Sequence, residues 1–106
     1  MNDNKNYRQK VYEYLLTIPY GKVVTYKTIA IYLGNIHLAR YVGNVLHSNS
    51  RPDYYPCYKV VNSKGKLAIN FGDGGLTIQK ERLEKEEIVV IDNAVDLKKY
   101  EYKGIV

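Results

Sequence analysis

The sequence predicts a single, mainly helical domain with short strands, organised around a helix-turn-helix. Apolar residues recur at helical spacing in several short segments, two of these segments are separated by Gly34, and β-branched residues gather only in short runs. A chain of 106 residues has room for one domain, which we place over residues 1–106. Its 45% apolar and 25% charged residues are ordinary for a globular protein.

The first helix is predicted near the N-terminus, where large apolar residues recur three and four positions apart. We expect Asp3 or Asn4 to cap it and Pro19 to end it. A short extended piece, 22–24, follows. The apolar face consists of Tyr7, Val11, Tyr14, Leu15 and Ile18.

The next two helices form the predicted helix-turn-helix. Thr25 is placed to cap a helix over 26–33, and Gly34 to end it in a left-handed conformation. Asn35 then begins a third helix at about 36–48. Two short helices around a glycine turn are typical of DNA-binding domains, although an ordinary helical hairpin has the same pattern.

One side of this third helix carries unusually small residues. Ala39 and Gly43 lie four positions apart, which leaves a smooth strip beside Arg40 where a backbone or groove wall can approach. Glycine inside a helix costs about 1 kcal/mol relative to alanine, so it usually has a packing reason. The opposite, apolar stripe consists of Leu38, Val42, Val45 and Leu46.

The only cysteine, Cys57, follows Pro56 after a turn-rich loop. A lone cysteine is either a small buried hydrophobe or a nucleophile that another group activates, and both interpretations stay open on this stretch alone. Val60 and Val61 predict a short strand, which a turn at 62–65 directs back toward 67–69.

The C-terminal part is less regular. A glycine-rich loop at 72–75 lacks the flanks of a phosphate-binding loop, and a last amphipathic helix is predicted over 76–87. The apolar run 88–91 is a short strand or packing segment. We assign no role to 92–106, where periodicity is weak.

Charge is distributed unevenly. Residues 1–66 carry ten basic and three acidic side chains, a net +7, whereas 67–106 carry six basic and eight acidic, a net −2. A basic part that contains the cysteine indicates a polyanionic partner, above all nucleic acid, although a generic lysine-rich surface has the same composition. One cysteine and two histidines do not favour a metal site, and we expect no cofactor. Candidate phosphate contacts are Lys22, Lys27, Arg51 and Lys59.

The motif around the cysteine, Pro56-Cys57-Tyr58-Lys59-Val60, resembles the Pro-Cys-His-Arg-Val motif of the O6-alkylguanine-DNA alkyltransferases, or methylated-DNA–protein-cysteine methyltransferases. In size the chain is close to their relatives, the alkyltransferase-like proteins. The resemblance covers about residues 7–88. Further matches at the family's spacings are Gly21-Lys22-Val23-Val24-Thr25-Tyr26, Arg40 seventeen before the cysteine, Asn49 eight before it, Gly74-Gly75-Leu76, and Glu86 ten after that leucine.

The resemblance implies a winged-helix-like helix-turn-helix domain and a single-use DNA repair reaction. Cys57 is expected to attack the alkyl carbon on guanine O6, while Tyr26 gives a proton to the departing guanine. Glu86 stands at the end of the family's proton relay, and Tyr58 takes the place of the relay histidine. Asn49 is expected to hold the turn through backbone hydrogen bonds.

The resemblance also implies how DNA is engaged, because an alkyl group inside a duplex cannot reach the thiol. The family flips the nucleotide out, and Arg40 corresponds to the arginine that fills the gap. Ala39 and Gly43 correspond to small residues that lie in the minor groove. Tyr26 and Lys59 complete the expected DNA-binding set. The partner implied is double-stranded DNA that contains O6-alkylguanine.

Three departures bear on the reaction. Tyr58 replaces the histidine, and a phenol with a pKa near 10 is a poor base at pH 7. Asp73 stands where a small residue is common, in a loop that is longer than expected. Gln79 stands where a lysine is often found, whereas Lys59 for arginine keeps the charge.

Two functions therefore remain open. In the first, the chain transfers the alkyl group to Cys57; in the second, it flips and flags alkylguanine for other repair proteins without transfer. We expect an intracellular, DNA-associated monomer, since no apolar run is long enough to span a membrane and residues 1–6 lack the apolar core of a signal peptide.

Overall fold

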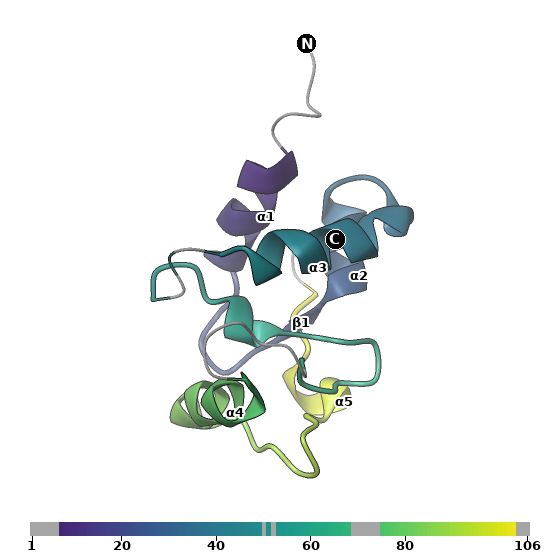
Figure 1. The fold of residues 1–106 in the computed structure, drawn as a ribbon. Coiled ribbons are helices and arrows are strands. Elements are labelled where there is room, and N and C mark those ends of the chain that lie inside the picture. The colour runs from purple at the N-terminus through teal and green to yellow at the C-terminus, as the bar shows by residue number, and fades with distance from the viewer. Residues whose placement is uncertain (1–6, 50, 52, 69–74, 104–106) are drawn as a thin grey trace.

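A computed structural model describes residues 7–49, 51, 53–68 and 75–103. The mainly helical fold with short strands is confirmed, and helices gather at opposite ends of the molecule (Figure 1). The expected cap at Asp3 or Asn4, and the comparisons made for Asp73 and Gly74, lie outside the described residues. The elements are α1 (Tyr7–Leu15), β1 (Val24–Thr25), α2 (Tyr26–Tyr32), η2 (Ile36–Leu38), α3 (Ala39–His47), η3 (Cys57–Lys59), β2 (Val60–Val61), α4 (Gly75–Lys85) and α5 (Leu97–Tyr100).

The start of the helix-turn-helix follows its sequence signals. The Thr25 side chain accepts a hydrogen bond from the Thr28 backbone N–H and caps α2. Gly34 follows the helix with φ +96°, a conformation that glycine adopts without steric cost. The predicted boundaries of this helix are therefore correct to within one residue.

The third predicted helix is divided in two, which corrects the expectation of one continuous helix over 36–48. A single tight 3₁₀ turn, η2, precedes α3. The Asn35 side chain accepts from the backbone N–H of His37, and the Asn35 carbonyl accepts from that of Leu38 at 3.0 Å. These bonds close the turn more tightly than an α-helix does.

The two strands pair in parallel, with Val24 opposite Val60 and Thr25 opposite Val61. β2 therefore joins a strand far away in the sequence and does not form a hairpin with the segment that follows it. The described part of that segment ends at Ala68 and reaches a different part of the chain: the Leu67 N–H donates to the Asn93 carbonyl at 2.9 Å.

The C-terminal segment 92–103, to which we assigned no role from its sequence, is part of the fold. Val23 donates to the Tyr100 carbonyl at 2.9 Å, and Tyr102 donates to the Val23 carbonyl at 2.8 Å. The short helix α5 lies immediately before this contact, so α4 is not the last helix as expected. α4 also ends two residues early, and Glu87 leaves it with φ +65°.

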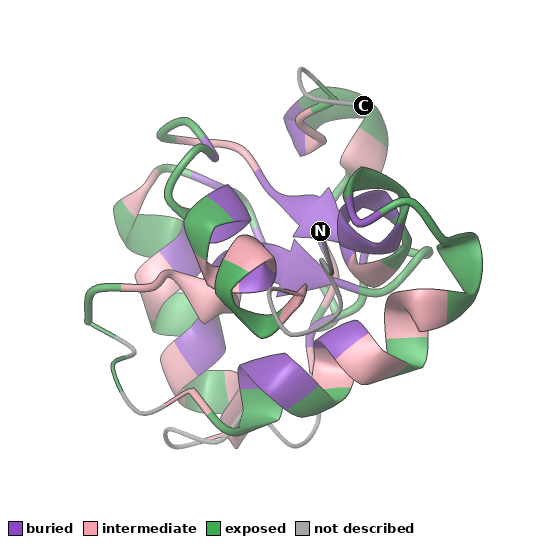
Figure 2. Cartoon of the chain, turned by 90° about the horizontal axis from the view of Figure 1, so that it is seen from above, coloured by how far each residue is buried: buried purple, intermediate pink, exposed green. Residues whose placement is uncertain are grey.

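Buried side chains form two clusters, and Figure 2 shows the two strands buried between the surrounding helices. The first cluster packs α1, α2 and α3 together, and the second packs β2 against α4 and the C-terminal segment. Cys57 packs against the first and Tyr58 against the second, so the turn η3 joins the two halves of the core. Among the described residues, no helix has the length and apolar character needed to cross a bilayer.

Candidate active site and DNA-facing helix

Cys57 begins the one-turn helix η3, directly after Pro56. Its side chain is half-buried. The loop before it is held by Asn49, whose Nδ2 donates to the Tyr55 carbonyl at 3.0 Å while its Oδ1 accepts from the Arg51 N–H at 2.8 Å. These are backbone hydrogen bonds of the kind expected for Asn49, and they hold in place the loop that leads to Cys57.

Tyr26, the first residue of α2, lies on the same side of the turn as Cys57. Both pack against the first cluster, and the Tyr26 ring faces α3 at Gly43. Burial, and then the neighbouring Cys57, raise the pKa of Tyr26 above its usual value of 10.0. The phenol therefore keeps its proton at neutral pH and can donate it.

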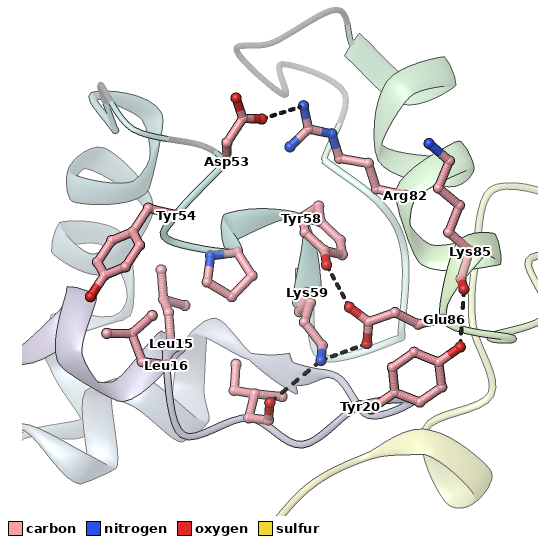
Figure 3. Close-up of a pocket in the computed structure, with 12 residues that line it drawn as sticks. Leu15, Leu16, Tyr20, Asp53, Tyr54, Tyr58, Lys59, Arg82, Lys85 and Glu86 are labelled. Carbon is pink, nitrogen blue, oxygen red and sulfur yellow. Dashed lines mark hydrogen bonds and ion pairs between the residues drawn. The ribbon is translucent and has the colours of Figure 1, made fainter.

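Tyr58 points to the other side of the turn. Its hydroxyl donates to Oε2 of Glu86 at 2.5 Å, as the dashed line in Figure 3 marks. Burial and then this bond to Glu86 raise the pKa of Tyr58 well above 10.0. Tyr58 is thus a hydrogen-bond donor to Glu86 that keeps its proton, and it does not act as a base at neutral pH.

Lys59 and Glu86 form a buried ion pair behind Tyr58, with Nζ and Oε1 2.7 Å apart. The same Oε1 accepts from the Gly21 N–H at 3.0 Å, and Nζ also donates to the Pro19 carbonyl at 2.8 Å. Burial alone would raise the pKa of Glu86, but the hydrogen bonds from Lys59, Tyr58 and Gly21 outweigh it and lower the pKa. Glu86 is therefore an anion whose oxygens are already engaged.

This geometry corrects the expectation that Lys59 contacts DNA. Its side chain is only 3% exposed, and its ammonium group points inward at a carboxylate and a backbone carbonyl. Lysine suggested a surface charge because it is rarely buried without a partner. Sequence reasoning did not predict that Glu86 would be that partner.

From the sequence, Gln79 was a departure from the family and, as an alternative to Ile78, a candidate for the apolar face of the last helix; the structure places it against the Cys57 turn. It is fully buried in α4 and bonds to the backbone on both sides of Lys59. Its place on the apolar face of the helix, three after Leu76 and four before Leu83, was the signal that it points inward.

A cavity of about 580 Å³ opens on the Tyr58 side of the turn (Figure 3). Tyr58, Lys59 and Glu86 line it together with the end of α1, and Cys57 is not part of its lining. At its edge Arg82 pairs with Asp53 at 3.3 Å.

The exposed face of α3 carries the other predicted residues. Arg40 is exposed, whereas Ala39 and Gly43 are half-buried beside it. Of the phosphate candidates, Lys27 and Arg51 are exposed, and Lys22 lies partly buried with Nζ donating to the Lys99 carbonyl at 3.3 Å. In the part of the chain that is described, no group of three or more histidine, cysteine or acidic side chains could hold a metal ion.

Residues 6–88 match the family described as the DNA-binding domain of 6-O-methylguanine DNA methyltransferase. Alkyltransferase-like protein 1 of Schizosaccharomyces pombe is 36% identical over 86 residues, which span 81% of this chain and 80% of that protein. The methylated-DNA–protein-cysteine methyltransferase of Rattus norvegicus is 35% identical over 76% of this chain, but the match spans only 38% of the rat protein.

Among solved structures, the S. pombe protein Atl1 in complex with damaged DNA containing O6-carboxymethylguanine superposes with a TM-score of 0.86. The match is 32% identical and covers 97% of this chain and 99% of that one. The fold of the described residues is therefore the fold of a chain crystallised on alkylated DNA.

Proposed function

Since this chain belongs to the family of 6-O-methylguanine DNA methyltransferase DNA-binding domains, we propose that it is a DNA repair protein that extrudes O6-alkylguanine from a duplex and accepts the alkyl group on Cys57. The observation that carries the proposal is the side-by-side packing of Cys57 and Tyr26, a nucleophile and a phenol that keeps its proton, beside the exposed face of α3. Residues 7–88 supply this site, and the C-terminal segment completes the fold around it.

The α3 face supports lesion extrusion. Arg40 is exposed next to two small residues, Ala39 and Gly43, so the helix can approach a narrow groove while one long cationic side chain enters it. We propose that the extruded base enters next to the Tyr26 ring, which faces Gly43. These positions are proposed as the DNA-contacting set, with Lys27 and Arg51 as phosphate contacts.

The transfer step needs a thiolate and an acid. The Cys57 sulfur forms a bond to the alkyl carbon as the bond from that carbon to guanine O6 breaks. The electron pair stays on the guanine, which takes a proton from Tyr26, and Tyr26 regains a proton from the solvent that received the thiol proton. The product is a thioether, which water does not cleave, so each molecule acts once. An ordinary thiol with a pKa near 8.5 is only a few per cent ionised at about pH 7, so a group that takes the thiol proton would accelerate the transfer.

A second function, lesion binding without transfer, is favoured by the Tyr58–Glu86 hydrogen bond. Because Tyr58 donates to Glu86, and Glu86 already accepts from Lys59 and Gly21, neither residue is poised to take a proton from the thiol. The S. pombe relative bears the name alkyltransferase-like protein. In this function the chain would mark the lesion for other repair proteins.

The intact mass of the protein after incubation with a duplex containing O6-methylguanine separates the two functions. A gain of one methylene unit, located on Cys57 by peptide mapping and absent in Cys57→Ser, establishes transfer. Preferential binding of the alkylated duplex with unchanged mass establishes the second function. No preference for the alkylated duplex and no mass change would contradict both.

Binding to plain duplex should weaken steeply as salt rises, because a basic surface displaces counterions from several phosphates. The affinity is measured by fluorescence anisotropy from about 50 to 200 mM salt, over which loss of about a hundredfold or more is expected for several contacts. An affinity that hardly changes over this range would contradict the electrostatic part of the proposal.

A further inference from the structure

We propose that Gln79 is a positioning residue: its side-chain amide holds the backbone of the Cys57 turn, and through it sets how well the site distinguishes alkylated from plain duplex. The inference rests on the proposed function and extends it to a residue that touches neither DNA nor the thiol. It is carried by the hydrogen bonds of one fully buried side chain.

The Gln79 amide connects three backbone groups in two separate segments. Its Nε2 donates to the Tyr58 carbonyl at 3.1 Å and to the Val60 carbonyl at 3.3 Å, and its Oε1 accepts from the Ala68 N–H at 2.8 Å. Both protons of the amide nitrogen are therefore in use. One side chain thus ties the turn that carries the cysteine to the strand after it and to the segment at Ala68.

The Gln79 hydrogen bonds fix the position of the backbone around Cys57 more than they stabilise the fold through burial of apolar surface. An apolar side chain of the same size would fill the space, but it would leave two carbonyls and one N–H buried without partners. Because η3 has only one turn, it has little internal bonding of its own: Lys59 donates to the Pro56 carbonyl, and Val60 to the Cys57 carbonyl. External bonds must therefore determine where Cys57 lies.

Helix α4 and the residues that follow it hold the turn at two points. Gln79 binds its backbone, and Glu86 binds the side chains of Tyr58 and Lys59. Figure 3 shows the Glu86 contacts converging on the turn from α4. Loss of the Gln79 contacts leaves the side-chain contacts in place but frees the backbone, and a displacement of about 1 Å at a reacting atom can cost up to about a hundredfold.

The first test compares Gln79→Met with Leu83→Ala. Leu83 is fully buried one turn further along the same helix, so its truncation destabilises the fold without removing a bond to the Cys57 turn. The readout is the affinity for a duplex with O6-methylguanine divided by the affinity for the plain duplex, at a temperature where both variants are folded by circular dichroism. We expect Gln79→Met to lower this ratio about tenfold and Leu83→Ala to leave it unchanged.

The second test uses Gln79→Glu, in which protonation restores part of the contact. The neutral acid can still donate one hydrogen bond to a backbone carbonyl, whereas the carboxylate cannot donate any. The selectivity of Gln79→Glu relative to the native chain should therefore fall as pH rises from 5 to 9. A merely structural role gives no reason for lesion selectivity to follow this titration.

The outcomes separate the inference from the proposed function. Equal losses of selectivity in Gln79→Met and Leu83→Ala would assign the effect to stability and overturn the inference. Unchanged selectivity in Gln79→Met, or a ratio for Gln79→Glu that does not vary with pH, would overturn it as well. If the native chain itself does not prefer the alkylated duplex, the proposed function fails and the inference falls with it.

Discussion

The hydroxyl of Tyr58 donates a hydrogen bond to Glu86, at the position where the family that the chain resembles has a relay histidine. A relay histidine also donates to its acidic partner, but its second ring nitrogen can take a proton from the cysteine, and a tyrosine side chain has no such group. Burial and Glu86 hold the Tyr58 pKa far above neutral, so the group cannot accept the thiol proton at the pH of a cell. We therefore do not expect Tyr58 to remove the proton from the Cys57 thiol.

We expect Tyr58→His to transfer alkyl groups about tenfold faster than the native chain or more, because an imidazole supplies a base near neutral pH. Tyr58→Phe is the matched control, since it removes the same hydrogen bond without adding a base. Single-turnover rates from pH 6 to 9 check this. A native rate that is already high and independent of pH would show that the thiolate forms by another route.

Arg40→Ala should weaken lesion binding more than Lys10→Ala does. Arg40 is exposed on α3 next to the small residues, whereas Lys10 lies on α1. The signal of a fluorescent base analogue that reports extrusion should fall with Arg40→Ala only, because only this side chain can replace the extruded base. Equal effects from both substitutions would reduce Arg40 to an ordinary phosphate contact.

Glu86→Gln should lower the free energy of unfolding by roughly 3–5 kcal/mol, because it leaves the buried Lys59 ammonium without its counter-charge. Asp53→Asn is the control: it removes an ion pair with Arg82 in which the Asp53 side chain is 94% exposed, and such pairs contribute little. Urea unfolding of both variants measures the difference. Similar small losses would mean that Lys59 is satisfied by the Pro19 carbonyl alone.

Acid should destabilise the native chain partly through Glu86. Its pKa is lower in the folded than in the unfolded protein, so its contribution is complete above the ordinary value of 4.5 and is lost as the pH falls through the folded value. The urea midpoint should therefore fall more steeply below about pH 4.5 in the native chain than in Glu86→Gln. Parallel curves would assign the acid sensitivity to other carboxylates.

Tyr14→Phe should leave stability at pH 7 unchanged or raise it by up to about 1 kcal/mol, since the buried Tyr14 hydroxyl has no hydrogen-bond partner among the described residues. Tyr12→Phe is the matched control, because its hydroxyl donates to the Val45 carbonyl at 2.9 Å and its loss should destabilise. Burial raises the pKa of Tyr14 to about 12, so the native chain should lose stability above pH 10 through this group, whereas the Phe variant should not. Urea unfolding at pH 7 and pH 11 measures both effects.

The helices could be predicted from sequence because their signals are local. The Thr25 cap and Gly34 lie next to the boundaries that they set, and three-four periodicity is visible within a few residues. The parallel pairing of Val24 with Val60 could not be predicted, because a two-residue strand carries no information on its partner. α5 was missed because four residues are too few to show a period.

The candidate site could be proposed from the sequence as a set of residues but not as a network of contacts. The resemblance around Cys57 implied Tyr26, Tyr58 and Glu86. The direction of the Tyr58–Glu86 bond and the burial of Lys59 depend on how α4 packs against η3, and no local pattern encodes that packing. A charged residue beside the cysteine suggested a ligand contact, whereas Lys59 binds Glu86 and the Pro19 carbonyl and so holds a turn in place.

The pairing of Val23 with residues 100–102 has a consequence for how the chain folds during synthesis. β1 pairs with β2, but Val23, directly before β1, obtains its partners only when residue 102 has left the ribosome, so this edge stays open while most of the chain already exists. An open strand edge next to unburied valines is the kind of surface that invites association with other nascent chains. Completion of the core therefore depends on contacts that join distant parts of the chain, which slows the final step of folding relative to the formation of the helices.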